Sequence, residues 1–421
     1  MIDLRRIRED PAPTRAALAR IGAAEDLDRL LELDARRREL LPEVEGLRAE
    51  RNEASDAIGA AKREGGDASE AIERMRGVSA RIKELEGELE TVDADRDDLA
   101  ARIPNPPDPE APDGETDEDA VVLREVGEPA EFGFDVRDHL DLGRDLGLID
   151  TEKAAAASGS RFAYLKGGLV LVELALIRYA VEVIGEEGFE PVVPPVLVRE
   201  EALYGTGYFP GEREMIYEVT ADELFLVGTS EVTLAALHAG EILEADQLPI
   251  RYGGISTCFR REAGAAGKDT RGIFRVHQFD KVEMFSFVEP SQSEEEHERL
   301  LSIEERILTG LEIPFRVVDI AAGDLGAPAA RKFDCEAWIP SQGRYRELTS
   351  TSNTTDYQAR RLECRFRPAG GGSPEPVHTL NGTATAVGRT LLAIMENHQQ
   401  EDGTIAVPQA LVDRGAPETL G

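Results

Sequence analysis

Arginine and glutamate residues alternate along one stretch of the chain whose side chains could hold a polyphosphate. The run Phe259-Arg260-Arg261-Glu262 is followed by Arg275, Phe279 and Glu283. Arginine suits phosphate and carboxylate oxygens better than lysine, because its planar guanidinium fork can donate to two of them at once. The neighbouring carboxylates could bind a divalent metal ion or an ammonium group. We therefore expect a site that holds a triphosphate, a metal ion and a small amine together.

Two later segments carry related chemistry. The run Glu347-Leu348-Thr349-Ser350 offers carboxylate and hydroxyl oxygens, which are the hard ligands that Mg²⁺ prefers. A second run, from Gly382 to Thr390, contains a further arginine, Arg389. One arginine alone would indicate a surface ion pair, but three arginines in separate motifs favour phosphate binding. Neither the dinucleotide motif GxGxxG nor a P-loop motif occurs, so the sequence does not indicate a Rossmann or P-loop site.

Taken together, these motifs resemble those of the class II aminoacyl-tRNA synthetases, and among them the seryl-tRNA synthetases. The resemblance extends through Ser352 to Arg361 and covers nearly the whole chain. It implies an enzyme that joins L-serine to ATP as seryl-adenylate and passes serine to the 3′ end of tRNA(Ser). Whether tRNA(Sec) is also a substrate is left open. The alternatives are an amino acid:carrier-protein ligase of the same fold and a non-enzymatic coiled-coil scaffold.

The resemblance also implies roles for individual residues around ATP. Arg260 and Arg389 are expected to be catalytic, with Arg260 on the α-phosphate and the serine carboxylate. Phe279 is expected to stack on adenine, although in most proteins such a residue is an ordinary core aromatic. Glu347 and Ser350 are the expected Mg²⁺ ligands, and the segment 263–272 is expected to close over ATP. The full ATP-binding set implied is Arg260, Arg261, Glu262, Arg275, Val276, Phe279, Glu347, Leu348, Thr349, Ser350 and Arg389.

The serine pocket implied by the resemblance contains acidic and hydroxyl side chains. Thr229 and Glu231 are expected to meet the ammonium group, while Glu283 and Thr383 are expected to meet the hydroxyl group. A pocket built to hydrogen-bond a hydroxyl rejects alanine, because alanine would leave buried polar groups unpaired. Threonine must be excluded by size. The full serine-binding set implied is Thr229, Ser230, Glu231, Glu283, Asn381 and Thr383.

The N-terminal part of the chain, from about 28 to 103, predicts two long helices. Apolar residues recur at alternating steps of three and four, which is the heptad pattern of a coiled coil. Gly65-Gly66-Asp67 can reverse the chain between the helices, giving an antiparallel hairpin. By itself the hairpin would indicate a spacer or dimerisation element, but the resemblance implies an arm that binds tRNA. The predicted seam is Leu33, Leu40, Val44, Leu47, Ala54, Ile58 and Ala61 in the first helix, with Arg37 and Arg51 intruding. In the second helix it is Ala71, Met75, Val78, Ile82, Leu85, Leu89, Val92, Arg96, Leu99 and Ile103, with Arg96 as the one polar interruption.

The chain is expected to divide into an N-terminal domain (1–105), an acidic linker (106–120) and a catalytic domain (121–421). Prolines at 104, 106 and 107 end the second helix. Seven acidic residues lie between 108 and 119, which favours a flexible connection.

Beyond the linker, the pattern favours an α+β fold with an antiparallel sheet flanked by helices, because strands and helices do not alternate as βα units. We expect helices at 167–184 and 384–399, and strands at 224–227 and 282–287. The proline-broken strand 189–198 resembles the family's dimer-interface motif, which implies a homodimer.

The excess of acidic residues is the unusual feature of the composition. The chain has 83 acidic and 48 basic residues, a formal net charge of −35. A GC-rich genome would account for the scarcity of lysine but not for the excess of acid. We favour salt adaptation, in which carboxylates keep the surface hydrated while salt screens their repulsion. Such acidity opposes nucleic-acid binding on average, but it does not exclude a local basic patch.

The remaining features indicate a cytoplasmic protein without a membrane segment. Cys258, Cys335 and Cys364 are scattered, which favours buried free thiols over disulfides, with a zinc site as the less favoured alternative. The N-terminus lacks the apolar region of a signal peptide, and no apolar stretch is long enough to cross a bilayer.

Overall fold

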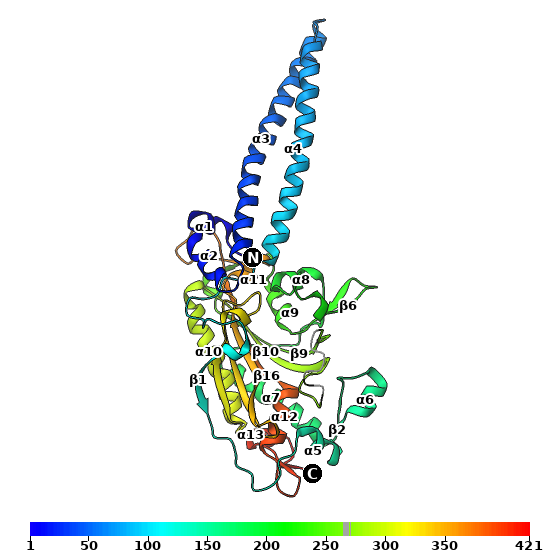
Figure 1. The fold of residues 1–421 in the computed structure, drawn as a ribbon, viewed down its shortest axis with the longest axis vertical. Helices are drawn as coiled ribbons and strands as arrows, with labels where there is room; N and C mark the ends of the chain where they lie inside the picture. Colours follow the sequence, from blue (N-terminus) through cyan, green and yellow to red (C-terminus); the bar gives the residue numbers. More distant parts are fainter. Residues whose placement is uncertain (264–268, 270) are drawn as a thin grey trace. The chain divides into compact units, whose positions relative to one another are not determined.

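A computed structural model describes residues 1–263, 269 and 271–421, which form two compact units (Figure 1). Residues 3–103 make up the first unit. The second unit contains residues 104–421 together with residues 1–2. The two units are described separately below.

The first unit is a helical hairpin with two short helices at its start. Helix α1 (Leu4–Glu9) and helix α2 (Pro11–Ala19) each begin at an aspartate whose side chain accepts backbone N–H groups. The long helices α3 (Ala24–Arg63) and α4 (Ser69–Arg102) follow and contact each other (Figure 1). Gly65 lies between them with φ +74°, a left-handed conformation that glycine adopts without strain.

Packing between α3 and α4 follows the predicted seam. Every predicted seam residue of the two helices is buried or half-buried except Ala71. Charged residues flank the seam and form ion pairs across it. Arg37 Nε lies 2.7 Å from Asp93 Oδ1, and Arg48 Nη2 lies 2.6 Å from Glu86 Oε1. The hairpin is therefore held by one apolar stripe and bordered by ion pairs that stay open to solvent.

The second unit is built on an eight-stranded sheet with the order β1-β11-β12-β13-β16-β10-β9-β4. Neighbouring strands are antiparallel, except that β4 runs parallel to β9. The predicted antiparallel sheet is confirmed, with this one parallel edge added. The strands are β1 (Val121–Val126), β4 (Glu190–Val192), β9 (Ile250–Phe259), β10 (Gln278–Val288), β11 (Phe315–Asp319), β12 (Arg331–Ile339), β13 (Arg344–Asn353) and β16 (His378–Ala386).

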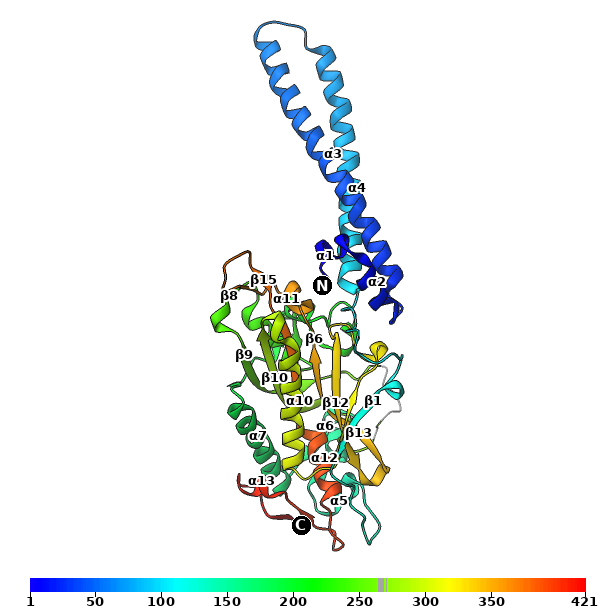
Figure 2. The same cartoon turned by 90° about the vertical axis from the view of Figure 1, so that its left-hand side faces the viewer.

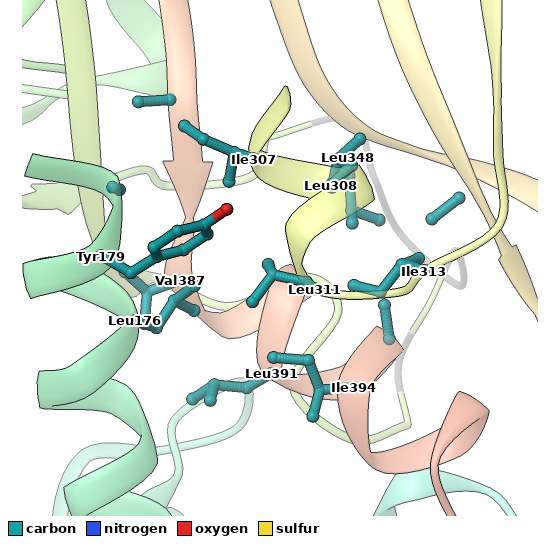
Figure 3. Close-up of a cluster of buried hydrophobic side chains, with 14 of the residues drawn as sticks. Leu176, Tyr179, Ile307, Leu308, Leu311, Ile313, Leu348, Val387, Leu391 and Ile394 are labelled. Atoms are coloured by element: carbon teal, nitrogen blue, oxygen red, sulfur yellow. The ribbon is translucent and has the colours of Figure 1, made fainter. Parts of the chain in front are cut away.

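Three helices bury their apolar faces in the core of this unit. Side chains of α7 (Gly168–Glu186), α10 (Ser293–Gly310) and α12 (Val387–Asn397) join one hydrophobic cluster with the inner residues of the sheet. Figure 2 shows α7 and α10 running alongside the strands. In the close-up, Leu176 and Tyr179 of α7 lie near Val387 and Leu391 of α12 (Figure 3).

Smaller elements surround this core. The helices are α5 (His139–Asp145), α6 (Thr151–Ser158), α8 (Glu200–Thr206), α9 (Glu231–Ala235), α11 (Tyr357–Arg361) and α13 (Gln409–Val412). Short strands make small separate sheets: β5 (Leu197–Val198) with β6 (Tyr217–Val219) and β7 (Leu224–Leu226), β8 (Ile242–Glu244) with β14 (Arg365–Arg367) and β15 (Glu375–Pro376), β2 (Ile149–Asp150) with β3 (Tyr164–Leu165), and β17 (Ile405–Ala406) with β18 (Thr419–Leu420).

Two segments differ from the sequence prediction. The predicted helix 384–399 begins only at Val387, because residues up to Ala386 complete strand β16. The segment 189–198 is divided between β4 and β5, which belong to different sheets. Prolines at 194 and 195 separate the two strands, since proline cannot donate to a strand ladder.

The acidic segment after α4 is held against the second unit. Asn105 N donates to Ala327 O at 2.8 Å, and Asp108 N donates to Ala330 O at 2.8 Å. Ala111 is buried in a small apolar cluster. The expectation of a flexible connection was therefore wrong here, because backbone hydrogen bonds and small apolar contacts outweigh the charge of the segment.

Candidate active site

A cavity of about 310 Å³ in the second unit gathers most of the residues predicted to carry chemistry. Arg260, Arg275 and Arg389, which are far apart in sequence, all line it. Acidic and hydroxyl side chains lie beside them, so one cavity joins cationic and anionic groups. The predicted residues lining it are Glu231, Arg260, Glu262, Arg275, Val276, Phe279, Glu283, Glu347, Leu348, Ser350, Asn381, Thr383 and Arg389.

Strand geometry explains how β10 places its charged residues. Successive side chains of a strand point to opposite faces of the sheet. Lys281 and Glu283 therefore face the cavity, while Val282 and Met284 enter the hydrophobic core beneath it. The same alternation on β16 places Asn381 in the cavity and Leu380 in the core.

Glu231 is a buried residue of the cavity lining and is fixed by three neighbours. Its Oε1 accepts hydrogen bonds from Gln358 Nε2 at 2.7 Å and from Asn381 Nδ2 at 3.0 Å. Its Oε2 accepts from the hydroxyl of Tyr208 at 3.3 Å. Burial raises the pKa of Glu231, while the hydrogen bond from Gln358 and the charge of Lys281 oppose that rise. A buried, rigidly held carboxylate of this kind suits a small ammonium group.

Glu283 is the second buried carboxyl group of the site, with 1% of its surface exposed. Burial raises the pKa of Glu283 to about 7. The charge of Lys281, whose Nζ forms an ion pair with Glu283 Oε2, opposes that rise, whereas the charge of Glu231 adds to it. Thr383 stands directly opposite Glu283 in the β10–β16 pairing. The two residues together offer a polar wall suited to a hydroxyl group.

Arg260 follows the last residue of β9 and is held on two sides. Its Nε donates to Gly228 O at 3.1 Å, and its guanidinium carbon lies 5.3 Å from the centre of the Phe279 ring. The backbone of Arg260 also pairs with His277, which closes the base of the segment between β9 and β10. The arginine is thus positioned before any ligand binds, as electrostatic catalysis requires.

The other two arginines pair with carboxylates of the same cavity. Arg275 Nη1 donates to Glu262 Oε2 at 2.7 Å, and Arg389 Nη1 lies 3.3 Å from Glu347 Oε1. The guanidinium of Arg389 also stands 4.7 Å from the ring centre of Phe274. Both arginines are therefore held by carboxylates of the same cavity, and a guanidinium group can donate to phosphate oxygens in the same way as to carboxylate oxygens.

Glu347 and Ser350 fit the requirements of Mg²⁺. Partial loss of water raises the pKa of Glu347, but Arg389, Lys332 and Arg260 outweigh that effect and leave the pKa below its ordinary value. The Glu347 side chain remains 48% exposed, and its lowered pKa means that the carboxylate is ionised. Mg²⁺ is usually bound through one or two carboxylates and the phosphates of its substrate. An ionised carboxylate and a hydroxyl group that both line a cavity with arginines match that pattern.

Four predicted residues do not line the cavity. Thr229 and Ser230 are buried behind it, where Thr229 Oγ1 accepts from Glu231 N at 3.2 Å. Arg261 stands over the ring of Tyr217 at 5.7 Å. Thr349 lies on the opposite face of β13 from Ser350, as strand alternation requires. Residues 264–268 and 270 of the predicted ATP loop lie outside the described part of the chain.

Several cavity residues were not found from the sequence. Lys281 could have been found, because it stands two positions before Glu283 on the same strand face. Tyr208 and Lys332 offered no such signal, since their approach to the site depends on how distant elements pack. The same holds for Gln358, which does not line the cavity but donates to Glu231. No cluster of three or more His, Cys, Asp or Glu side chains suited to a metal ion occurs among residues 1–263, 269 and 271–421.

A sheet of this order, with arginines and carboxylates gathered in one cavity on its strands, is the catalytic core of a class II aminoacyl-tRNA synthetase. Residues 216–398 match the family model described as tRNA synthetase class II core domain (G, H, P, S and T). Residues 1–107 match the model described as Seryl-tRNA synthetase N-terminal domain. The chain belongs to the seryl-tRNA synthetase family.

Individual relatives are similar to this chain over its whole length. The chain is 52% identical to a serine–tRNA ligase of Thermobifida fusca, covering 98% of this chain and 96% of that protein. It is 48% identical to one of Rubrobacter xylanophilus, covering 100% and 99%. Among solved structures, it resembles seryl-tRNA synthetase of Pyrococcus horikoshii complexed with ATP, with a TM-score of 0.92 and 42% identity over 100% and 99% of the two chains.

The described helices were compared with the requirements for spanning a membrane. In the part of the chain that the structure describes, none of them combines the length and the apolar composition needed to span a bilayer.

Proposed function

We propose that this chain activates L-serine with ATP and transfers it to tRNA(Ser). The observation that carries the proposal is the junction of two environments in one cavity: a buried acidic pocket around Glu231 and Glu283, and a cationic region around Arg260 and Arg389. The first suits a small hydroxylated amine, and the second suits a triphosphate. Family membership supports the same reaction.

The residues contribute mainly by position and charge. Glu231 holds the ammonium of serine, and Arg260 holds the serine carboxylate beside the α-phosphate, so that the carboxylate oxygen can attack phosphorus in line. Arg260 also stabilises the charge that develops during the attack, while Arg275 and Arg389 hold the departing phosphates. Phe279 stacks on adenine. Bound Mg²⁺ would neutralise phosphate charge, with Glu347 and Ser350 as its protein ligands.

Selection of serine is proposed to rest on Glu283 and Thr383. Alanine would leave both groups without a partner in a buried pocket, which costs about 1–3 kcal/mol for each unpaired group. Threonine is opposed by the close packing around Glu283.

Serine-dependent exchange of pyrophosphate into ATP is the direct test of activation. Charging of a tRNA(Ser) transcript then separates this function from an amino acid:carrier-protein ligase, and a tRNA(Sec) transcript in the same assay tests the second RNA substrate. Exchange with no dependence on serine would exclude the proposed substrate.

The proposed domains are a tRNA-binding domain (1–105) with a coiled-coil arm (28–103), an acidic linker (106–120) and the catalytic domain (121–421). Support for the arm comes from the match of residues 1–107 to the family's N-terminal domain. A homodimer in the cytoplasm is part of the same proposal. Leu171 and Leu174 on α7 and Val193 after β4 are exposed apolar residues, with Val193 80% exposed, as expected of a surface that a second copy covers. Light scattering of wild type and Leu174→Asp would test the dimer.

Salt adaptation is proposed as the cause of the net charge of −35. Self-repulsion between carboxylates destabilises the folded chain at low ionic strength, and salt screens it. The melting temperature should therefore rise between dilute buffer and molar KCl, and a constant or falling value would end this proposal.

A further inference from the structure

Two β-bulges lie under the proposed active site. The pairing of β10 with β16 shifts register so that Val282 faces Thr385 and Glu283 faces Thr383, which leaves Ala384 as an extra residue. The pairing of β12 with β13 shifts in the same way and leaves Leu348 as the extra residue. Bulges re-aim side chains and are common beside active sites. One of these bulges sets the serine-facing Thr383, and the other lies within the proposed ATP and Mg²⁺ segment.

One buried carboxyl group connects the two bulges. Glu304 of α10 has no exposed surface. Its Oε1 accepts from the backbone N–H of Thr383 at 3.0 Å, and its Oε2 is hydrogen-bonded to the hydroxyl of Thr349 at 2.7 Å. Gly382 allows this close approach, because a Cβ atom there would stand 3.2 Å from Glu304 Oε1 and 3.1 Å from Met284 Cε. Glu304 touches neither the cavity nor, by this geometry, a substrate.

We propose that Glu304 is a positioning residue, which fixes the two bulges so that Thr383 meets the serine hydroxyl and the segment 347–350 meets ATP. The inference rests on the proposed function, since it concerns the pocket that selects serine. It predicts that serine selectivity depends on a side chain lying on the far side of the sheet from the substrate.

Glu304 is not proposed to act through a negative charge. Burial raises the pKa of Glu304 well above its usual value, and the nearby carboxyl groups of Asp334 and Glu283 raise it further. The neutral acid is therefore favoured, and its O–H would donate to the Thr349 hydroxyl. Glutamine has nearly the same shape and keeps both contacts, because its Oε1 can accept from the Thr383 N–H while its Nε2 donates to the Thr349 hydroxyl. Alanine would leave the Thr383 N–H and the Thr349 hydroxyl without these partners and would free both bulges to move.

Glu296 offers a matched control on the same helix. It is also buried, accepts from Arg251 Nε and Nη2 at 2.6 Å each, and accepts from Ser286 Oγ at 2.7 Å. None of its partners lies at a bulge or lines the cavity. Glu296→Ala should therefore lower the melting temperature without changing the serine pocket.

The test compares wild type, Glu304→Ala, Glu304→Gln and Glu296→Ala in pyrophosphate exchange with serine, alanine and threonine, alongside their melting temperatures. For Glu304→Ala we expect the KM for serine to rise about tenfold and the preference for serine over alanine to fall about tenfold, the loss of one well-placed hydrogen bond. Glu304→Gln should stay within about threefold of wild type in both. Unchanged KM and preference in Glu304→Ala, or the same change in Glu296→Ala, would overturn the inference.

Thr349→Val carries the test if Glu304→Ala does not fold. This nearly isosteric change removes only the hydroxyl that is hydrogen-bonded to Glu304, outside the cavity. It should still raise the KM for serine or ATP, and wild-type values would overturn the inference. Wild-type protein without any serine-dependent exchange would instead refute the proposed function.

Discussion

The titration of Glu283 should make the binding of serine depend on pH. The proposed partner of Glu283 is the serine hydroxyl, and an ionised carboxylate accepts such a hydrogen bond more strongly than a neutral acid does. Because burial raises the pKa of Glu283 to about 7, the group changes its charge in the range where the enzyme can be assayed. Serine binding should therefore weaken as the pH falls below 7.

The size of the effect follows from the pKa. With a pKa of about 7, Glu283 is roughly nine-tenths ionised at pH 8 and roughly one-tenth ionised at pH 6. If only the ionised form binds serine well, the KM for serine should rise roughly ninefold between these two values. A carboxyl group with the ordinary value of 4.5 would be almost fully ionised at both and would produce almost no change.

The same shift has a consequence for stability. A carboxyl group whose folded pKa lies above its unfolded pKa binds more protons in the folded state between those two values, so its contribution to stability falls as the pH rises from about 4.5 to about 7. The loss is of order 3 kcal/mol for a shift of this size. Glu283→Gln removes this titration, so between pH 5 and pH 8 its melting temperature should change less than that of wild type, and it should bind serine poorly.

Pyrophosphate exchange at pH 6, 7 and 8 with saturating ATP and Mg²⁺ is the assay for serine KM. Glu283→Gln provides the control, because its weaker binding should no longer change with pH over this range. A wild-type KM that stays constant, or one that falls as the solution becomes more acidic, would refute the reasoning about Glu283.

Three other changes test separate parts of the site. Arg260→Ala should reduce exchange by about 10²–10³-fold with the fold intact by circular dichroism, because a preorganised cation beside the reacting phosphate is lost. Lys281→Met removes the cation that opposes the effect of burial, so it should raise the pKa of Glu283 and move the pH dependence of serine KM to higher pH. Deletion of residues 28–103 should spare exchange but abolish charging of tRNA(Ser), because the proposed arm contacts only the RNA.

Each of these outcomes has a clear opposite. Near-normal turnover in Arg260→Ala would remove that arginine from the mechanism, and an unmoved pH profile in Lys281→Met would separate the lysine from Glu283. Equal loss of exchange and charging after the deletion would contradict the role of the arm.

Local patterns in the sequence predicted the first unit well. The seam residues of the long hairpin depend on heptad spacing, which is a property of neighbouring positions on each helix. Arg37 could be recognised in the sequence as a charged residue within the apolar seam. Its partner Asp93 could not, because the ion pair forms only when the two helices lie side by side. The loop prediction at Gly65 was similarly local and is confirmed.

For the site, the sequence supplied residue types and the fold supplied their environment. The motif residues Arg260, Glu283 and Arg389 could be named in advance, since their chemistry and spacing are written in the chain. The neighbours that hold the site residues could not be named in advance: Tyr208 and Gln358, which hold Glu231, were identified only from the folded structure. Thr349 shows the limit most clearly, because its place in a motif predicted an ATP contact whereas its strand face directs it to Glu304.

By itself, the order of residues predicted the helical hairpin and the α+β class and, through the family resemblance, the residues proposed to bind ATP, serine and a metal ion. Only the tertiary structure decided that two bulges would re-aim neighbouring strands, that Glu304 would join them, and that Glu283 would titrate near neutrality. The physical reason is the separation along the chain of the residues involved. Helix periodicity depends on neighbouring positions, and the ligands that a side chain can bind depend on its own chemistry. Register shifts and loss of water depend instead on strands that come together from distant parts of the chain.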